Sequence, residues 1–170
     1  MIFLDPIFWM AMLAILPIYY KVKSINTKNV ILVLFSIIWY VRYAEWSALY
    51  LLTTVVTTWI YGYLYEKYKD SKSAHVFAWF IGIGVNLGIL LVLKYNGLIL
   101  TKGLNFWVPM GLSFYTFQAL GYCIDIRNGN CERENNIWNH ILFLCFIPQM
   151  VTGPISRKNQ LGAEFLKEKS

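Results

Sequence analysis

Four apolar runs, separated by short polar segments, occupy residues 3–20, 29–41, 46–65 and 76–93. A helix needs about 20 apolar residues to cross the hydrocarbon core of a bilayer. Residues 46–65 reach this length without a charged side chain, whereas 29–41 reach it only if the flanking aromatic residues act as interfacial anchors. The pattern therefore predicts a membrane-spanning helix in each run.

Residues 108–127 form a further stretch, in which polar and apolar positions recur with helical spacing. Pro109 and Gly111 favour a helix that starts near Leu112, and successive side chains then point about 100° apart. One side of this helix carries a polar stripe made of Tyr115, Gln118, Tyr122 and Asp125. The opposite side carries Phe114, Phe117, Leu120 and Ile124. Such a stripe indicates a face turned towards a cavity or a neighbouring helix.

Residues 137–151 are apolar but short for a membrane crossing. The segment is interrupted by Asn139, His140, Pro148 and Gln149. Irregular backbone is tolerated at membrane depth only where protein or a water-filled cavity covers it, so we expect a re-entrant or partial helix. Residues 94–107 are mixed and predict a loop with an interfacial turn of helix. The expected fold class is all-α, a polytopic membrane protein with about five transmembrane helices plus one short re-entrant or partial helix.

Helix-breaking and small residues give local expectations. Pro17 is expected to kink or end the first helix, because proline removes a backbone donor and clashes with the preceding turn. Gly84 and Gly88 have the spacing that allows two helices to approach closely. Asn86, between them, needs a polar partner in an apolar surrounding.

Composition agrees with a membrane protein, since 58% of the residues are hydrophobic and 14% are charged, against about 45–50% and about 25% in soluble domains. The formal net charge is +6, and basic residues gather in loops 21–28 and 66–72. Basic loops are retained on the cytoplasmic side, so the N-terminus is expected outside and the 125–136 loop inside. This topology accounts for the charge, and no nucleic-acid partner is expected.

Reactive side chains are few. The three cysteines form no C-x-x-C pair, so no metal site and no bound cofactor are expected. Cys123 and Cys145 lie in apolar runs and are expected to be core residues. Ser113 does not match the G-x-S-x-G nucleophile elbow, and we expect it to cap the start of its helix. The sequence offers no paired carboxylates for acid–base catalysis.

Two histidines are the available bases. His75 stands beside a charged loop and is expected to be a solvated, interfacial residue. His140 follows Asn139, but neighbouring positions on a helix point about 100° apart, so the two residues form no dyad by themselves. His140 is therefore a weak candidate for a catalytic residue.

Two motifs resemble the membrane-bound O-acyltransferase superfamily. They are PMGLSFYTFQALGYCIDIRNG and, downstream of it, FIPQMVTGPISR. The nearest branch comprises the bacterial alginate O-acetyltransferases and the D-alanyl transfer proteins of teichoic acid modification. The matching positions are Pro109, Gly111, Ser113, Phe114, Tyr115, Phe117, Gln118, Tyr122, Ile124, Asp125, Phe146, Pro148, Gln149, Gly153, Pro154, Ile155 and Arg157.

The resemblance implies transfer of an acyl group, acetyl or D-alanyl, to a hydroxyl of an exported polymer. An activated acyl donor would be a co-substrate, a histidine the base, and the bacterial plasma (inner) membrane the location, as in alginate biosynthesis. The residues expected to line the substrate tunnel are Tyr115, Gln118, Tyr122, Gln149 and Arg157. For the first three residues, hydrogen bonds to neighbouring helices are an equal alternative. The last two are expected to form a polar wall or to contact an anionic donor.

Members of this superfamily are longer, and their catalytic histidine follows the G-P-I-x-R motif. Residues 1–170 therefore resemble the N-terminal part of the transferase domain, truncated and inactive alone. The expected partners of the chain are the lipid bilayer, the missing C-terminal half or other acyl-transfer proteins, and a polysaccharide acceptor. A split-enzyme subunit, a non-catalytic membrane scaffold and a small transporter that uses Asn86 and the polar stripe are the alternatives.

Overall fold

The computed structural model describes residues 5–95, 108–147 and 158. These residues form helices and no strand, which confirms the expected all-α class for this part of the chain. The α-helices are α1 (Pro6–Lys21), α2 (Ile25–Ala44), α3 (Ala48–Lys67), α4 (Lys72–Trp79), α5 (Val85–Lys94), α7 (Leu112–Arg127) and α8 (Ile137–Cys145). A 3-10 turn, Glu45–Ser47, joins α2 to α3, and a π-helical turn, Phe80–Gly84, joins α4 to α5.

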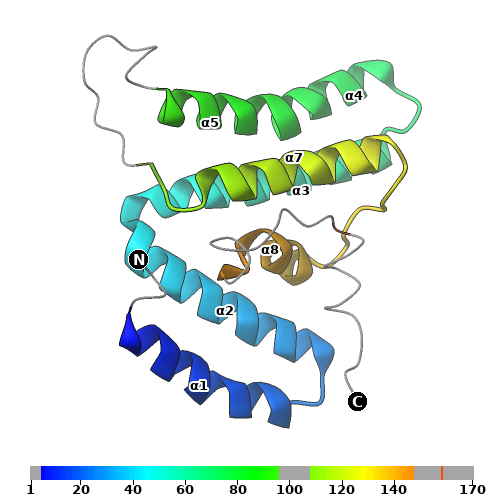
Figure 1. The fold of residues 1–170 in the computed structure, drawn as a ribbon. Helices are drawn as coiled ribbons and strands as arrows, with labels where there is room; N and C mark the ends of the chain where they lie inside the picture. Colours follow the sequence, from blue (N-terminus) through cyan, green and yellow to red (C-terminus); the bar gives the residue numbers. More distant parts are fainter. Residues whose placement is uncertain (1–4, 96–107, 148–157, 159–170) are drawn as a thin grey trace.

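Two helical runs are long and apolar enough to cross a membrane, Ile25–Lys67 and Lys72–Lys94. Glu45, with φ 47°, lies where the first run turns between α2 and α3, and the two helices run in opposite directions in Figure 1. Each has 20 residues, which corresponds to about 30 Å and matches the thickness of a bilayer core. The second run is continuous through the π-helical turn.

α3, α7 and the α4–α5 run lie with their axes roughly parallel or antiparallel, and the α1–α2 pair lies at an angle to them (Figure 1). α3 lies at the centre, where it packs against α7, the α4–α5 run and α8. α2 packs against α8, and α1 covers the outer side of α2. Large apolar side chains cover the outside, including Met10, Trp46 and Val76, as in a bundle surrounded by lipid.

Basic residues of distant loops meet at one end of the bundle. The α1–α2, α3–α4 and α7–α8 connections all lie at this end, on the right of Figure 1. Its cationic residues include Lys21, Lys23, Lys28, Lys67, Lys69, Lys72, Arg127 and Arg133. The opposite end holds the turn at Glu45 and the start of α1. The structure therefore brings together the basic loops that the sequence places on one side of the membrane.

The helix ends use different caps. The Asp5 carboxylate accepts a hydrogen bond from the Ile7 N–H at 2.9 Å and another from the Tyr43 hydroxyl, which ties α1 to α2. The Tyr43 bond lowers the pKa of Asp5. Pro17 lies inside α1 and does not end it. The expectation for Ser113 is wrong, because Gly111 is the N-cap of α7, with no side-chain cap.

The close helix contact involves a glycine other than the expected pair. Gly82 packs against Tyr61 of α3, and a Cβ at Gly82 would lie 2.7 Å from Cδ2 of Tyr61. A Cβ at Gly88 would meet nothing within 4 Å, and one at Gly84 would meet only Phe80, at 3.2 Å. The prediction for the Gly84 and Gly88 pair is therefore wrong, because Gly82 is the residue that faces α3.

The side-chain nitrogen of Asn86 has the polar partners that its position demands, whereas its side-chain oxygen has none among the described residues. Its side-chain amide donates to the Gly82 carbonyl at 2.7 Å and to the Thr57 hydroxyl at 2.9 Å. One bond stays within its own helix and the other reaches α3. This confirms that Asn86 needs a partner and links the π-helical turn to the central helix.

Candidate functional site

The two faces of α7 lie as the sequence predicts. Tyr115 and Tyr122 are 0% and 1% exposed, whereas Phe114 and Phe117 on the opposite face are 42% and 45% exposed. Gln118 and Asp125 of the stripe are also buried. The polar side chains therefore face the protein interior, and the aromatic ones face outwards.

The stripe bonds α7 to its neighbours. The Gln118 side chain donates to the Phe143 carbonyl of α8 at 2.8 Å, and the Tyr122 hydroxyl accepts from the Glu134 N–H at 3.2 Å. The Tyr115 hydroxyl is buried, and its polar neighbour is the Tyr40 hydroxyl of α2. Gln118 and Tyr122 thus hold the segment that follows α7 against it, and Tyr115 faces α2.

His140 lies at the contact of α8 with α3 and α7. It is 1% exposed, and its ring lies 5.4 Å from that of Trp59 and 5.1 Å from that of Tyr122. Its Nε2 is 2.9 Å from the Thr58 hydroxyl oxygen. The stripe and the only buried histidine of the described ranges therefore belong to one polar cluster.

The hydrogen bonds of Thr58 decide the tautomer of His140. The single Thr58 hydroxyl hydrogen is donated to the Thr54 carbonyl at 2.7 Å, so the oxygen accepts from Nε2–H of His140. Nδ1 then carries the lone pair, and no described residue bonds to it. His140 is thus a buried imidazole whose Nδ1 atom has no hydrogen-bond partner among the described residues.

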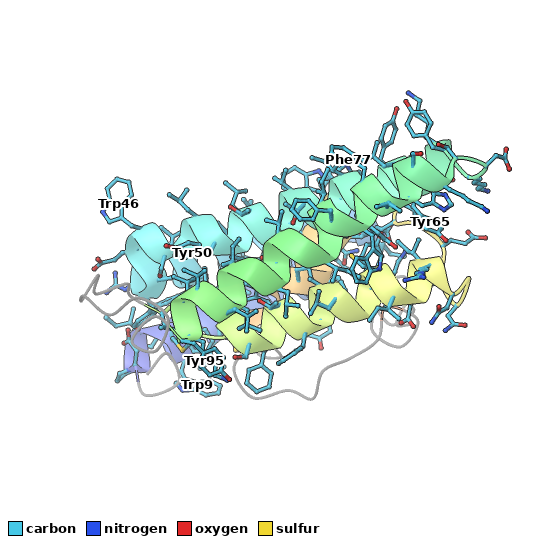
Figure 2. The ribbon with its side chains drawn as sticks, turned by 90° about the horizontal axis from the view of Figure 1, so that it is seen from above. Trp9, Trp46, Tyr50, Tyr65, Phe77 and Tyr95 are labelled. Atoms are coloured by element: carbon cyan, nitrogen blue, oxygen red, sulfur yellow. The ribbon has the colours of Figure 1, made fainter. Side chains whose placement is uncertain are left out.

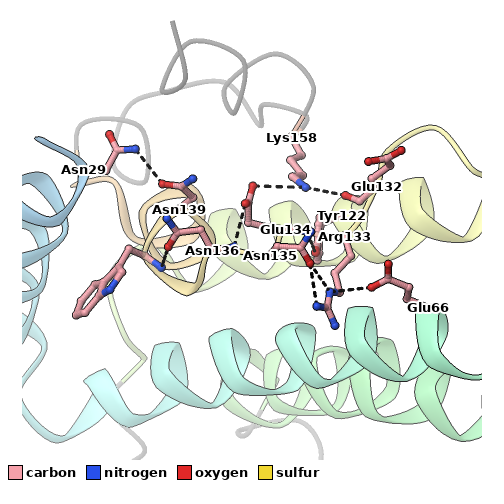
Figure 3. Close-up of polar contacts among 11 residues, drawn as sticks. Asn29, Glu66, Tyr122, Glu132, Arg133, Glu134, Asn135, Asn136, Asn139 and Lys158 are labelled. Carbon is pink, nitrogen blue, oxygen red and sulfur yellow. Dashed lines mark hydrogen bonds and ion pairs between the residues drawn. The ribbon is translucent and has the colours of Figure 1, made fainter. Parts of the chain in front are cut away.

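The Asn139 side chain points towards α2, away from the cluster around His140. Its side-chain oxygen accepts from the Asn29 amide of α2 at 2.9 Å, and both residues are buried (Figure 3). Asn139 and His140 thus bond to different helices, as expected for neighbours on a helix. The Asn29 partner could not be found from the sequence, because these positions are far apart along the chain.

Asn139→Ala is expected to destabilise the protein by about 1–3 kcal/mol, because it leaves the Asn29 amide buried without its partner. Asn26→Ala is the matched control, since it removes the same group from an exposed position on α2. Thermal unfolding of the purified variants in detergent measures the difference. Equal midpoints for the two variants would contradict the importance of the buried pair.

A clamp of charged and aromatic residues joins the α7–α8 connection to the end of α3 (Figure 3). Arg133 pairs with Glu66 at 3.1 Å, and its guanidinium lies 5.9 Å from the centre of the Trp59 ring. Lys158 lies 3.6 Å from the Glu134 carboxylate. The sequence indicated only a polar connection here, and the alternating charges of residues 132–134 are the signal that could have revealed it.

The remaining predicted residues occupy separate places. Cys123 and Cys145 are buried, as expected of core residues. Burial raises the pKa of the Cys131 thiol, which makes it a poor nucleophile. His75 is half-buried and stacks on Tyr65, so the expectation of a solvated side chain is wrong. Gln149 and Arg157 lie outside the described residues.

Known proteins resemble this chain along nearly its whole length. At 30% identity, 97% of the chain aligns with 33% of a probable alginate O-acetylase of Pseudomonas fluorescens. At 25% identity, 97% of the chain aligns with 38% of a peptidoglycan O-acetyltransferase of Helicobacter pylori. At 30% identity, 62% of the chain aligns with 26% of a teichoic acid D-alanyltransferase of Lacticaseibacillus rhamnosus. The chain is a homologue of the membrane-bound O-acyltransferases.

The chain spans about a third of the length of the curated O-acyltransferases that it matches. No protein-family model matches it. No solved structure matches it either.

The first O-acyltransferase motif shapes the entry into α7. Gly111 has φ 76°, a left-handed conformation that glycine adopts without strain. The Leu112 N–H donates to the Pro109 carbonyl at 3.2 Å, which closes the turn. The Met110 carbonyl accepts from the Tyr40 hydroxyl, also at 3.2 Å. The P-x-G positions of the motif thus anchor the start of α7 to α2.

Proposed function

We propose that this chain is the N-terminal part of a membrane O-acyltransferase that transfers an acyl group, acetyl in the first place, to hydroxyls of an exported polysaccharide. The observation that carries the proposal is the similarity of 97% of the chain to proteins named as O-acetylases or O-acetyltransferases of such polymers. The acyl donor is an activated acyl group used as a co-substrate.

In this proposal the polar cluster forms one wall of the substrate tunnel. Tyr115, Gln118 and Tyr122 belong to the wall, together with Gln149 and Arg157. The burial of all three side chains on the inner face of α7 supports this role. The catalytic base comes from the C-terminal half of the transferase or from a second subunit, and the chain alone is inactive.

The proposed location is the bacterial inner membrane, with about five spans and α8 as a partial helix. α8 has nine residues, which corresponds to about 14 Å and is too short to cross a bilayer core. The end of the bundle that collects the basic loops faces the cytoplasm, where basic loops are retained. The two long apolar runs support this arrangement.

A chimera tests the proposed function. The chain would replace the matching third of the Pseudomonas fluorescens alginate O-acetylase, and O-acetylation of secreted alginate would be measured. The chimera is expected to acetylate alginate, whereas the 170-residue chain alone is not. Gln118→Leu in the chimera is expected to lower acetylation by roughly tenfold to a hundredfold, because small displacements of a reaction site have effects of this order.

Phe117→Leu, on the exposed face of α7, is the control and is expected to retain acetylation. A chimera that accumulates in the membrane without acetylating alginate would contradict the proposal. Acetyl transfer by the chain alone, abolished by His140→Ala, would show instead that His140 supplies the base.

A further inference from the structure

A hollow lies at the basic end of the bundle, away from the cluster around His140. It has a volume of about 330 Å³ and lies between the end of α3, the start of α4 and the end of α7. Its lining residues are Tyr65, His75, Val76, Trp79 and Arg127. Figure 2 shows Tyr65 near this end of the bundle.

Two hydrogen-bond donors of the hollow lack an anionic partner. The Arg127 side chain is exposed and forms no ion pair with a carboxylate in the described part of the chain. The Nε2 atom of His75 is buried and has no hydrogen-bond partner among the same residues. A guanidinium and an imidazole N–H are both suited to bind the oxygens of a phosphate group.

Aromatic rings hold both groups in place. The His75 ring stacks on that of Tyr65, with 4.4 Å between centroids, and the Tyr65 hydroxyl donates to the Arg127 carbonyl at 3.3 Å. The Arg127 guanidinium lies 5.9 Å from the centre of the Trp79 ring. The two donors thus come from α4 and α7, and Tyr65 of α3 connects them.

The surface beside the hollow is apolar. Val76, Phe77 and Phe80 of the long apolar run are 71%, 61% and 66% exposed. Val76, which lines the hollow, and Phe80 are four residues apart and lie on one face of the helix. A molecule with a phosphate in the hollow could lay a hydrocarbon chain along this face. These features belong together in a phospholipid.

We propose that this hollow binds the phosphate of an anionic phospholipid such as phosphatidylglycerol. Arg127 and His75 bind the phosphate oxygens, Trp79 and Tyr65 lie at the headgroup level, as aromatic residues do at membrane interfaces, and the acyl chains follow the exposed face of α4. The proposal does not depend on acyl transfer, so its test is independent of the test of the proposed function.

Native mass spectrometry of the purified chain in detergent tests the site. Phosphatidylglycerol and phosphatidylcholine would be added at equal concentration, and the lipid that stays bound would be measured. The chain is expected to retain phosphatidylglycerol in preference, and Arg127→Gln is expected to lower the retention about fivefold, since one basic residue at a membrane surface contributes about 1 kcal/mol.

Arg42→Gln is the matched control. The Arg42 guanidinium lies 5.8 Å from the centre of the Trp39 ring, a very similar stack, and Arg42 does not line the hollow. Its replacement is expected to leave retention unchanged. Equal losses for the two variants would overturn the proposal, because they would indicate a general effect of charge. Retention of inorganic phosphate in place of lipid would also overturn it.

His75→Phe gives a second, independent variant. It keeps an aromatic ring against Tyr65 but removes the imidazole N–H, and it is expected to lower phosphatidylglycerol retention severalfold, as expected for one lost hydrogen bond to a charged group. This variant decides the question if Arg127→Gln does not fold. Full retention by a folded His75→Phe protein would overturn the proposed site.

Discussion

Gly82→Ala is expected to destabilise the helical bundle by about 1–3 kcal/mol, the usual range for inserting atoms into a packed core. The added Cβ would lie 2.7 Å from Cδ2 and 2.9 Å from Cβ of Tyr61. Because Tyr61 Cβ is attached to the α3 backbone, rotation of the ring alone cannot relieve this clash. α3 and the π-helical turn must therefore move apart.

This movement would also strain two bonds that hold the bundle centre. The Tyr61 hydroxyl donates to the Cys123 carbonyl of α7 at 2.9 Å, and Asn86 bridges the Gly82 carbonyl and Thr57. Thermal unfolding in detergent, followed by circular dichroism, measures the loss. The substitution is informative because alanine is otherwise the better helix former by about 1 kcal/mol.

Gly88→Ala provides the control from the same helical run. Its new Cβ would meet nothing within 4 Å, so this variant is expected to be as stable as the wild type or slightly more stable. If Gly82→Ala unfolds at the same temperature as Gly88→Ala, the close packing of Gly82 against Tyr61 is refuted.

His140→Ala is the second substitution with a large expected effect, a loss of about 3 kcal/mol, comparable with the truncation of a buried aromatic ring. The substitution would leave a cavity between Trp59 and Tyr122. It would also remove the N–H that donates a hydrogen bond to the Thr58 hydroxyl oxygen. Thermal unfolding again gives the measurement. Assays of acyl transfer with His140 variants must therefore compare equal amounts of folded protein.

A double-mutant cycle isolates the bond between Thr58 and His140. The two single variants, Thr58→Val and His140→Ala, and their combination are expected to show a coupling energy of about 1 kcal/mol. Additive effects of the Thr58 and His140 substitutions would rule out the hydrogen bond between them.

His75→Ala provides a comparison for His140→Ala. His75 is half-buried, so its replacement is expected to lower the stability less than His140→Ala does.

Several features of the fold follow from local pattern. The sequence predicts that α7 begins near Leu112, and the helix starts there. It also predicts opposite faces for Gln118 and Phe117, which are buried and exposed respectively. Both predictions hold because the helical repeat relates nearby residues without reference to the rest of the chain.

The expectations that failed required knowledge of a neighbouring helix. Gly84 and Gly88 have the spacing of a close helix contact, yet Gly82 faces Tyr61, because the rotation of the helix about its axis depends on what packs against it. Of the two outcomes expected at Pro17, a kink or an end, the end is excluded, because α1 continues to Lys21. Spacing alone cannot distinguish the side of a helix that meets a partner.

The sequence alone determined that this is an apolar, helical chain with basic loops and the motifs of membrane-bound O-acyltransferases. It also determined that α7 has one polar and one apolar face. The tertiary structure decided which polar groups meet: Thr58 with His140, Asn29 with Asn139, and Arg127 with the hollow beside His75. The physical reason is that helical periodicity operates over a few residues, whereas these contacts depend on the relative shift and rotation of helices far apart in the chain.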